Sequence, residues 1–193
     1  AHVKGFLKYF DKQAIIATDL YNEIADCNID MIGVDPAMTL VYRDEYRKAL
    51  AEKVKFNVQM IQEWLVTKLD DLPTMTNMFS RELNLFTHCT EKSLSVESDK
   101  HWKEIFNHFG VKIETVAIGC CGMSGSFGHE KKHQDTSKKI YDLSWSKKIK
   151  EKGITNSMST GFSCRCQVKR MEGHVIKHPI EILEINRKKQ RMV

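Results

Sequence analysis

The sequence predicts an α/β fold in which a parallel sheet is flanked by helices. Short apolar segments alternate with amphipathic helical segments along most of the 193 residues. Glycines and prolines separate these segments, and a composition of 41% hydrophobic and 28% charged residues is ordinary for a globular chain. The strand–helix–strand order favours parallel strands that are joined by right-handed helical crossovers.

The first 75 residues are predicted to be mostly helical. The segment DMIGV at residues 30–34 predicts a short buried strand. Asp35 is a suitable N-cap for the helix that follows, and Pro36 suits the first turn of that helix. Pro73 and its polar neighbours mark a loop. Apolar residues at helical spacing predict three helices in this part, at residues 12–28, 35–53 and 56–69.

From residue 83 onward the alternation becomes regular. Gly110 and Gly153 stand where a helix would end before the next strand begins. The strands expected in this part cover residues 83–89, 111–121 and 155–161. The helices expected here cover residues 98–110, 130–153, a segment that starts near Arg165, and 179–188 with Pro179 in the first turn.

Charge and hydropathy exclude several classes of function. The net charge of +5 comes largely from lysines of helices and of the tail, which favours a solvated surface over a nucleic-acid interface. No apolar run approaches the roughly 20 residues that a transmembrane helix needs. The first ten residues lack the features of a signal peptide, and the chain starts without methionine. We therefore expect a piece of a longer protein without a transmembrane segment, either cytoplasmic or peripheral at the inner face of the membrane.

The cysteines are the most informative residues of the chain. Because no secretory signal accompanies them, metal binding or redox chemistry is favoured over structural disulfides. The neighbours Cys120 and Cys121 would also form a strained disulfide. Cys27 lies in a predicted helix apart from the others, and we expect it to be a packing residue. The six cysteines are Cys27, Cys89, Cys120, Cys121, Cys164 and Cys166.

Four of the cysteines come directly at or after the ends of predicted strands. Cys89 ends one strand, Cys120 and Cys121 end the next, and Cys164 follows the last. Sites in parallel sheets form at the carboxyl ends of the strands, so these four thiols should converge on one edge of the sheet. Thiolates are soft ligands that suit zinc and iron–sulfur clusters. The set therefore favours a metal or redox site, although any single free cysteine could also be a buried apolar residue.

The segment GCCGMSGSFGHE, residues 119–130, combines the adjacent thiols with regularly spaced glycines. Gly119, Gly122 and Gly125 allow backbone amides to approach an anionic centre closely. The segment lacks the Gly-Lys-Ser/Thr ending of a phosphate-binding loop and the spacing of a dinucleotide fingerprint. We therefore interpret these glycines as part of the surroundings of a metal centre.

Three further side chains are secondary candidates for this site. His88 precedes the first of the four cysteines and His129 follows the glycines, so either could be a substitute ligand or a hydrogen-bond donor to a ligand. Cys166 lies two residues beyond the last of the four. A thiol catalyst with Cys121 as nucleophile and His129 as base is a third, different alternative.

Three segments resemble a known family: LFTHCT, GCCGMSGSFGHE and STGFSCRCQVKRMEGHVIKHPIEIL. They are similar to the cysteine-rich CCG domain of bacterial FAD- and iron–sulfur-dependent D-2-hydroxyacid dehydrogenases, above all to the carboxyl-terminal part of the large single-chain type that acts on D-2-hydroxyglutarate or D-lactate. GVDPAMTLVYRDEYRKAL resembles the end of a preceding copy of the domain. The resemblance thus implies two domains: residues 1–75 as the mostly helical end of a degenerate first repeat, and residues 76–193 as the second CCG domain.

The resemblance also implies a role in electron transfer. Cys89, Cys120, Cys121 and Cys164 match the family's cysteines, which implies a 4Fe–4S cluster, or zinc, on these four. Gly161 stands where the family has a fifth cysteine, which argues against a larger, non-cubane cluster. FAD and ferredoxin-like domains would lie in an N-terminal part outside this chain, so the chain alone should not turn over substrate, and an electron acceptor would be a further partner. The alternative is a zinc-stabilised interaction module without redox activity.

Overall fold

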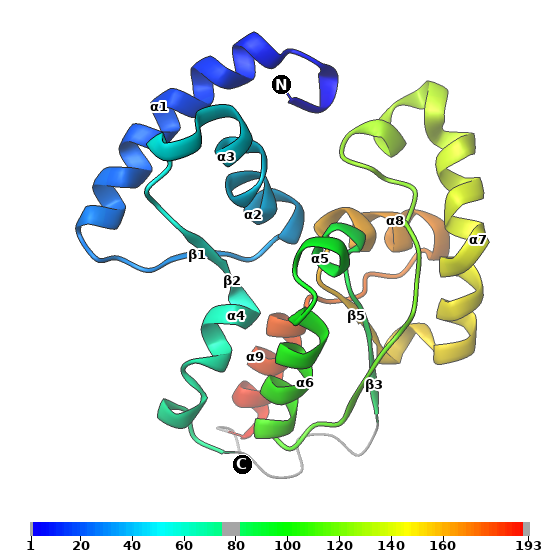
Figure 1. The fold of residues 1–193 in the computed structure, drawn as a ribbon. Coiled ribbons are helices and arrows are strands. Elements are labelled where there is room, and N and C mark those ends of the chain that lie inside the picture. The colour runs from blue at the N-terminus through cyan, green and yellow to red at the C-terminus, as the bar shows by residue number, and fades with distance from the viewer. Residues whose placement is uncertain (1, 75–81, 191–193) are drawn as a thin grey trace.

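The structure, a computed structural model, describes residues 2–74 and 82–190 and has an α/β fold (Figure 1). The described residues form two parallel sheets. In the first, β1 (Met31–Gly33) pairs with β2 (Val58–Met60). In the second, β3 (Leu83–Phe86) lies between β4 (Ile113–Thr115) and β5 (Ser157–Ser159). The parallel pairing and the flanking helices confirm the predicted fold class.

Helices make up most of the described chain. As predicted, Asp35 caps the helix after β1, because its Oδ1 accepts a hydrogen bond from the Met38 N–H at 3.1 Å. None of the described helices is both long and apolar enough to cross a bilayer. The α-helices are α1 (Leu7–Asp26), α2 (Pro36–Arg43), α3 (Glu45–Leu50), α4 (Ile61–Val66), α5 (Cys89–Leu94), α6 (Ser98–His108), α7 (Gln134–Lys152), α8 (Phe162–Glu172) and α9 (Pro179–Gln190).

The central strand β3 is buried on both faces, and its side chains alternate between two apolar cores. Leu85 packs in a core with Trp102 of α6, to which α4 and α9 also contribute. Phe86 points to the opposite face and packs against Trp145 of α7, with α8 beside it. Helices therefore cover both faces of the β4–β3–β5 sheet (Figure 1).

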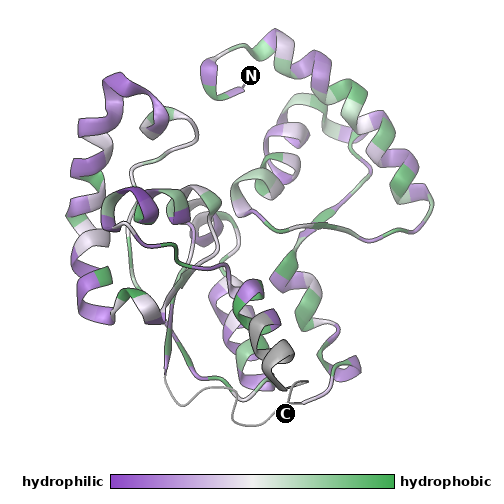
Figure 2. Ribbon diagram, turned by 180° about the vertical axis from the view of Figure 1, so that it is seen from behind, coloured by the Kyte–Doolittle hydropathy of each residue, from purple (hydrophilic) through white to green (hydrophobic). Residues whose placement is uncertain are grey.

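Helix α7 packs on this sheet through a narrow stripe of buried residues. Figure 2 shows α7 as largely hydrophilic. Its buried residues recur at every fourth position, which places them on one narrow stripe. The buried residues of α7 are Ser137, Tyr141, Trp145 and Ile149.

Two predictions for the first part of the chain need correction. The helix expected over residues 56–69 is wrong at its start, because Val58–Met60 is strand β2, and the α-helix covers only Ile61–Val66. The parallel partner β1 supplies hydrogen bonds that outweigh the local helical pattern. The helix expected over residues 35–53 breaks at Asp44, which separates α2 from α3.

Three predictions for the second part also need correction. The strand expected over residues 111–121 ends at Thr115, and the chain from there to Cys121 continues without regular structure. Cys89 begins the short helix α5 and does not end a strand. Helix α8 begins at Phe162 and not near Arg165. The boundary expected between residues 75 and 76 lies outside the described residues, so the two-domain division stays a prediction.

A buried carboxyl group ties the elements around β3 together. Glu91 of α5 is fully buried, and both Ser98 and Thr160 donate hydrogen bonds to it. Gln62 of α4 donates a further bond to Glu91 Oε1 at 3.0 Å. Burial raises the pKa of the Glu91 carboxyl, which favours its protonated form. The group therefore joins four elements of the fold through a single buried acceptor.

Substitution Glu91→Ala should destabilise the fold strongly, because it leaves buried donors from α4, α6 and the end of β5 without an acceptor. We expect the free energy of unfolding to fall by about 3 kcal/mol. Glu91→Gln keeps the shape and one acceptor oxygen, so it should cost clearly less. Urea unfolding monitored by circular dichroism would measure both, and equal losses for the two variants would contradict the role of the network.

A buried histidine at the start of α9 should make stability depend on pH. His178 accepts a hydrogen bond from the Ile180 N–H at 3.2 Å, so it serves as the N-cap of α9. Burial, reinforced by the positive charge of Arg165, lowers the pKa of His178 to about 3. The folded chain thus holds His178 neutral, whereas the unfolded chain takes up a proton below the ordinary pKa of about 6.5.

This stabilising contribution should be fully present above pH 6.5 and should decrease as the pH falls toward 3. At pH 5 the loss should reach up to about 2 kcal/mol relative to pH 7. His178→Asn, which can still cap the helix, should lose correspondingly less stability over this interval. Denaturant unfolding of both proteins at pH 7 and pH 5 would measure the difference, and parallel losses would show that His178 is not the source.

Candidate metal centre

The parallel sheet brings the ends of its three strands to one edge, and the four cysteines of interest lie there. Cys89 opens α5 shortly after β3, and Cys164 lies in the first turn of α8 after β5. Cys120 and Cys121 lie on the irregular segment that follows β4. The elements thus bring together thiols that are up to 75 residues apart in the sequence.

The four thiols interact with one another in a continuous chain. Cys120 lies close enough to Cys89 and to Cys121 for each of these thiols to affect its ionisation. Cys121 in turn interacts with Cys164 in the same way. Cys121 and Cys164 are buried, whereas Cys89 and Cys120 are partly exposed. The set therefore has a buried side against the core and an accessible side toward solvent.

Ionisation within this set is unequal, and Cys120 is the favoured thiolate. Hydrogen bonds from Cys121 and Cys89 lower the pKa of Cys120, and the Gly122 N–H adds a bond to its sulfur at 3.3 Å. The same contacts, together with burial, raise the pKa of Cys89 and Cys121. One negative charge is therefore shared among neighbouring S–H donors.

The described residues contain no group of three or more histidine, cysteine or carboxylate side chains that surrounds one point as the ligands of a single metal ion would. Neighbouring thiols interact in pairs, Cys89 with Cys120, Cys120 with Cys121 and Cys121 with Cys164. Their chemistry is that of soft thiolate donors, and one sulfur already accepts a backbone N–H. Four such donors suit a metal-bound group, although they would have to spread apart around it.

The glycines of residues 119–128 pack tightly against α7. Gly122 has a φ of +89°, and a side chain there would meet the Ser137 carbonyl oxygen at 2.2 Å. Gly119 contributes its carbonyl, which accepts a hydrogen bond from Trp145 Nε1 at 3.0 Å. Gly125 has a φ of +62°, but a Cβ atom there would make only an ordinary contact with Val3 Cγ1 at 3.7 Å. Gly122 is therefore required by both conformation and space, whereas Gly125 is required by conformation alone.

Two polar side chains of α8 secure this segment, and no local pattern in the sequence indicates their role. Arg170 donates to the Gly128 carbonyl oxygen at 2.6 Å and to Ser137 Oγ at 2.9 Å. Gln167 is fully buried and donates to the same Oγ at 3.1 Å. Arg170 therefore ties the end of the loop after Cys121 to α8, and both residues tie the start of α7 to α8.

The secondary candidates have different surroundings. His88 is buried directly beside the thiols and interacts electrostatically with Cys120. His129 is exposed, and no hydrogen bond among the described residues joins it to Cys121. Cys166 is partly buried at the margin of the core. Cys27 was expected to be a packing residue, but it lies just beyond the end of α1 and is exposed.

The geometry does not favour a thiol catalyst. Cys121 is buried, and the pKa of its thiol is raised by hydrogen bonds to Cys120 and Cys164 and by burial. A nucleophilic cysteine needs an accessible thiolate with a base beside it. The pairing of Cys121 with His129 therefore lacks both conditions.

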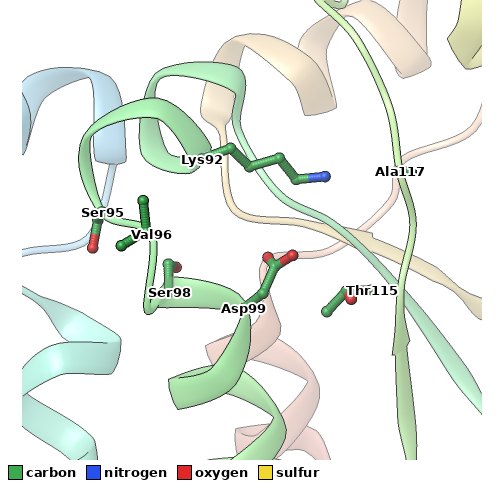
Figure 3. A pocket seen from close by; sticks show the side chains of 7 residues that line it. All are labelled: Lys92, Ser95, Val96, Ser98, Asp99, Thr115 and Ala117. Carbon is green, nitrogen blue, oxygen red and sulfur yellow. The ribbon is translucent and has the colours of Figure 1, made fainter.

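A separate pocket of about 380 Å³ lies near the site, between α5, α6 and the segment after β4. Figure 3 shows Lys92 extending across it toward the segment that contains Ala117, with the Asp99 carboxylate pointing into the same space. Lys92 Nζ already donates to the Val116 carbonyl oxygen at 2.9 Å. The lining contains no cysteine or histidine, so this pocket is not part of the thiol set.

In sequence the chain is similar to a class of dehydrogenases. The chain is 43% identical over 183 residues to D-2-hydroxyglutarate dehydrogenase of Escherichia coli K12. It is 44% identical over 190 residues to the Haemophilus influenzae enzyme of the same name and 42% identical over 182 residues to that of Pseudomonas putida. Each match covers 94% of this chain but 18% of the relative.

A more distant relative is one of the subunits of the anaerobic glycerol-3-phosphate dehydrogenase of Escherichia coli, which is 23% identical over 184 residues. That match covers 93% of this chain and 46% of the relative. No protein-family profile and no solved structure matches the chain. The resemblance to D-2-hydroxyacid dehydrogenases is confirmed, and the chain is related to a part of these oxidoreductases that spans less than a fifth of their length.

Gly122 and Gly125, the two glycines of residues 119–128 with positive φ, provide a matched test of the loop. Gly122→Ala should lower the free energy of unfolding by about 3 kcal/mol or more, because it adds overpacking against Ser137 to the cost of the left-handed backbone. Gly125→Ala carries only the backbone cost and should lose about 1 kcal/mol. Denaturant unfolding would measure both, and equal losses would mean that the close approach to α7 is not needed.

Proposed function

We propose that the chain is the carboxyl-terminal iron–sulfur electron-transfer domain of an FAD-dependent D-2-hydroxyacid dehydrogenase of the D-2-hydroxyglutarate or D-lactate type. The observation that carries the proposal is the contact among four thiols that come from three strand ends. Identity of 40–44% with D-2-hydroxyglutarate dehydrogenases over 94% of the chain supports the enzyme class.

Cys89, Cys120, Cys121 and Cys164 would hold a 4Fe–4S cluster, with Cys166, His129 and His88 as weaker candidates. When bound, such a cluster supplies a one-electron carrier. The surroundings suit an anionic group, because the Gly122 N–H already points at the Cys120 sulfur. The two buried cysteines would anchor it in the core, and the two partly exposed ones would face an exchange partner.

In this proposal, the other components of the reaction belong to parts of the protein outside this chain. A flavin domain would oxidise the hydroxyacid, a ferredoxin-like segment would pass electrons on, and this domain would lead them to an acceptor. The chain spans 18% of the length of its D-2-hydroxyglutarate dehydrogenase relatives, which leaves ample sequence for those domains. The 193 residues alone should therefore show no dehydrogenase activity.

Anaerobic reconstitution tests the ligand set directly. With ferrous iron and sulfide, the chain should bind about four iron and four sulfide ions and develop sulfur-to-iron charge-transfer absorption. Cys120→Ser should abolish this absorption, because it removes the favoured thiolate. Cys27→Ser is the matched control, since that cysteine is exposed and far from the set in sequence, and it should change nothing. A folded chain that takes up no iron would refute the proposal.

A zinc-stabilised module is the second candidate, because four thiolates are also an ordinary set of zinc ligands. It would bind one zinc ion per chain, and its melting temperature would collapse when a chelator is added. An equal melting temperature with and without chelator in zinc-loaded protein would exclude this candidate.

A further inference from the structure

The backbone conformation at Gly161 does not require a glycine. It is the N-cap of α8 with φ −76° and ψ 127°, an extended conformation that any residue adopts. The cap of this helix comes from elsewhere, because Asp35 Oδ2 accepts a hydrogen bond from the Phe162 N–H at 2.9 Å. The reason for glycine at this position must therefore be space.

The space in front of Gly161 is filled by a histidine and a cysteine. A Cβ atom at position 161 would lie 2.4 Å from His88 Cδ2 and 3.1 Å from His88 Cγ. The same atom would lie 3.0 Å from Cys164 Sγ. The imidazole of His88 and the thiol of Cys164 thus share the volume that a side chain at position 161 would need.

The imidazole is fixed in this place from two directions. His88 Nδ1 accepts a hydrogen bond from the Thr90 N–H at 3.3 Å, which makes His88 the N-cap of α5. The backbone N–H of His88 donates to Thr160 Oγ1 at 2.9 Å, directly before Gly161 in the chain. Because Thr160 also donates to the buried Glu91, the backbone from which the ring projects is held next to Gly161.

We propose that Gly161 and His88 form a matched pair: the His88 imidazole occupies the side-chain volume of position 161 beside Cys164 and thereby limits the centre to four thiolates. His88 is then a positioning residue, which acts by excluding a fifth ligand and by supporting Cys164. The exclusion of a fifth ligand rests on the proposed function, whereas the packing of His88 against Gly161 does not.

A double-mutant cycle on the metal-free, reduced chain tests the packing. Gly161→Ala should raise the unfolding equilibrium constant roughly tenfold or more, because its Cβ meets the imidazole. In a His88→Asn background most of this penalty should vanish, since asparagine is shorter and can still cap α5. Gly119→Ala is the matched control, because its Cβ would meet Ser144 Oγ at an ordinary 3.4 Å. Additive effects of the two substitutions would overturn the pairing.

Thiol protection after anaerobic reconstitution with ferrous iron and sulfide tests the ligand set. Alkylation followed by mass spectrometry would show which cysteines the bound group protects. With His88 present, a thiol introduced by Gly161→Cys should remain reactive toward the alkylating agent in the folded, iron-loaded chain. In His88→Asn/Gly161→Cys the new thiol should be protected together with the other four. If the thiol at position 161 is protected equally in Gly161→Cys and in His88→Asn/Gly161→Cys, then His88 does not exclude a fifth ligand.

The two proposals fail in different ways. If the unaltered chain folds but binds no iron, the iron–sulfur function is refuted, while the metal-free cycle still decides whether His88 and Gly161 are coupled. If the chain binds about four iron ions but the cycle is additive, the function stands and the matched pair is refuted.

Discussion

The parallel pairing of β3 with β4 on one side and β5 on the other is the constraint on which the rest of the structure depends. Parallel strands end at the same edge, so one hydrogen-bonding arrangement collects the segments that carry Cys89, the Cys120–Cys121 pair and Cys164. Helices cover both faces of the sheet, and apolar residues fill the spaces between the layers. The site is thus a consequence of topology.

Buried polar groups fix the relative positions of the elements at the strand ends. Glu91 accepts hydrogen bonds from side chains of α4, of α6 and of Thr160, which directly follows β5. Thr160 in turn accepts a hydrogen bond from the backbone N–H of His88. Asp35, which follows β1 and is only partly buried, caps both α2 and α8. Because unpaired buried groups are costly, such contacts hold the first part of the chain and the cysteine-bearing part in one relative position.

Two glycines beside the thiols serve different physical needs. Gly122 combines a left-handed backbone with close contact to Ser137, which lets its N–H reach the Cys120 sulfur. Gly161 has an ordinary backbone and makes room for the His88 ring. One glycine shapes the loop around a thiolate, and the other shapes the volume beside a thiol.

The sequence by itself determined the α/β class, most helices, the Asp35 cap and the four cysteines that meet, because periodicity, capping chemistry and motif spacing are local properties. It did not determine strand β2, the early end of β4 or the start of α5 at Cys89. Those depend on hydrogen bonds and packing between segments far apart in the chain. The roles of Arg170, Glu91 and the His88–Gly161 contact were decided only by the tertiary structure, since each exists through a neighbour that local sequence does not specify.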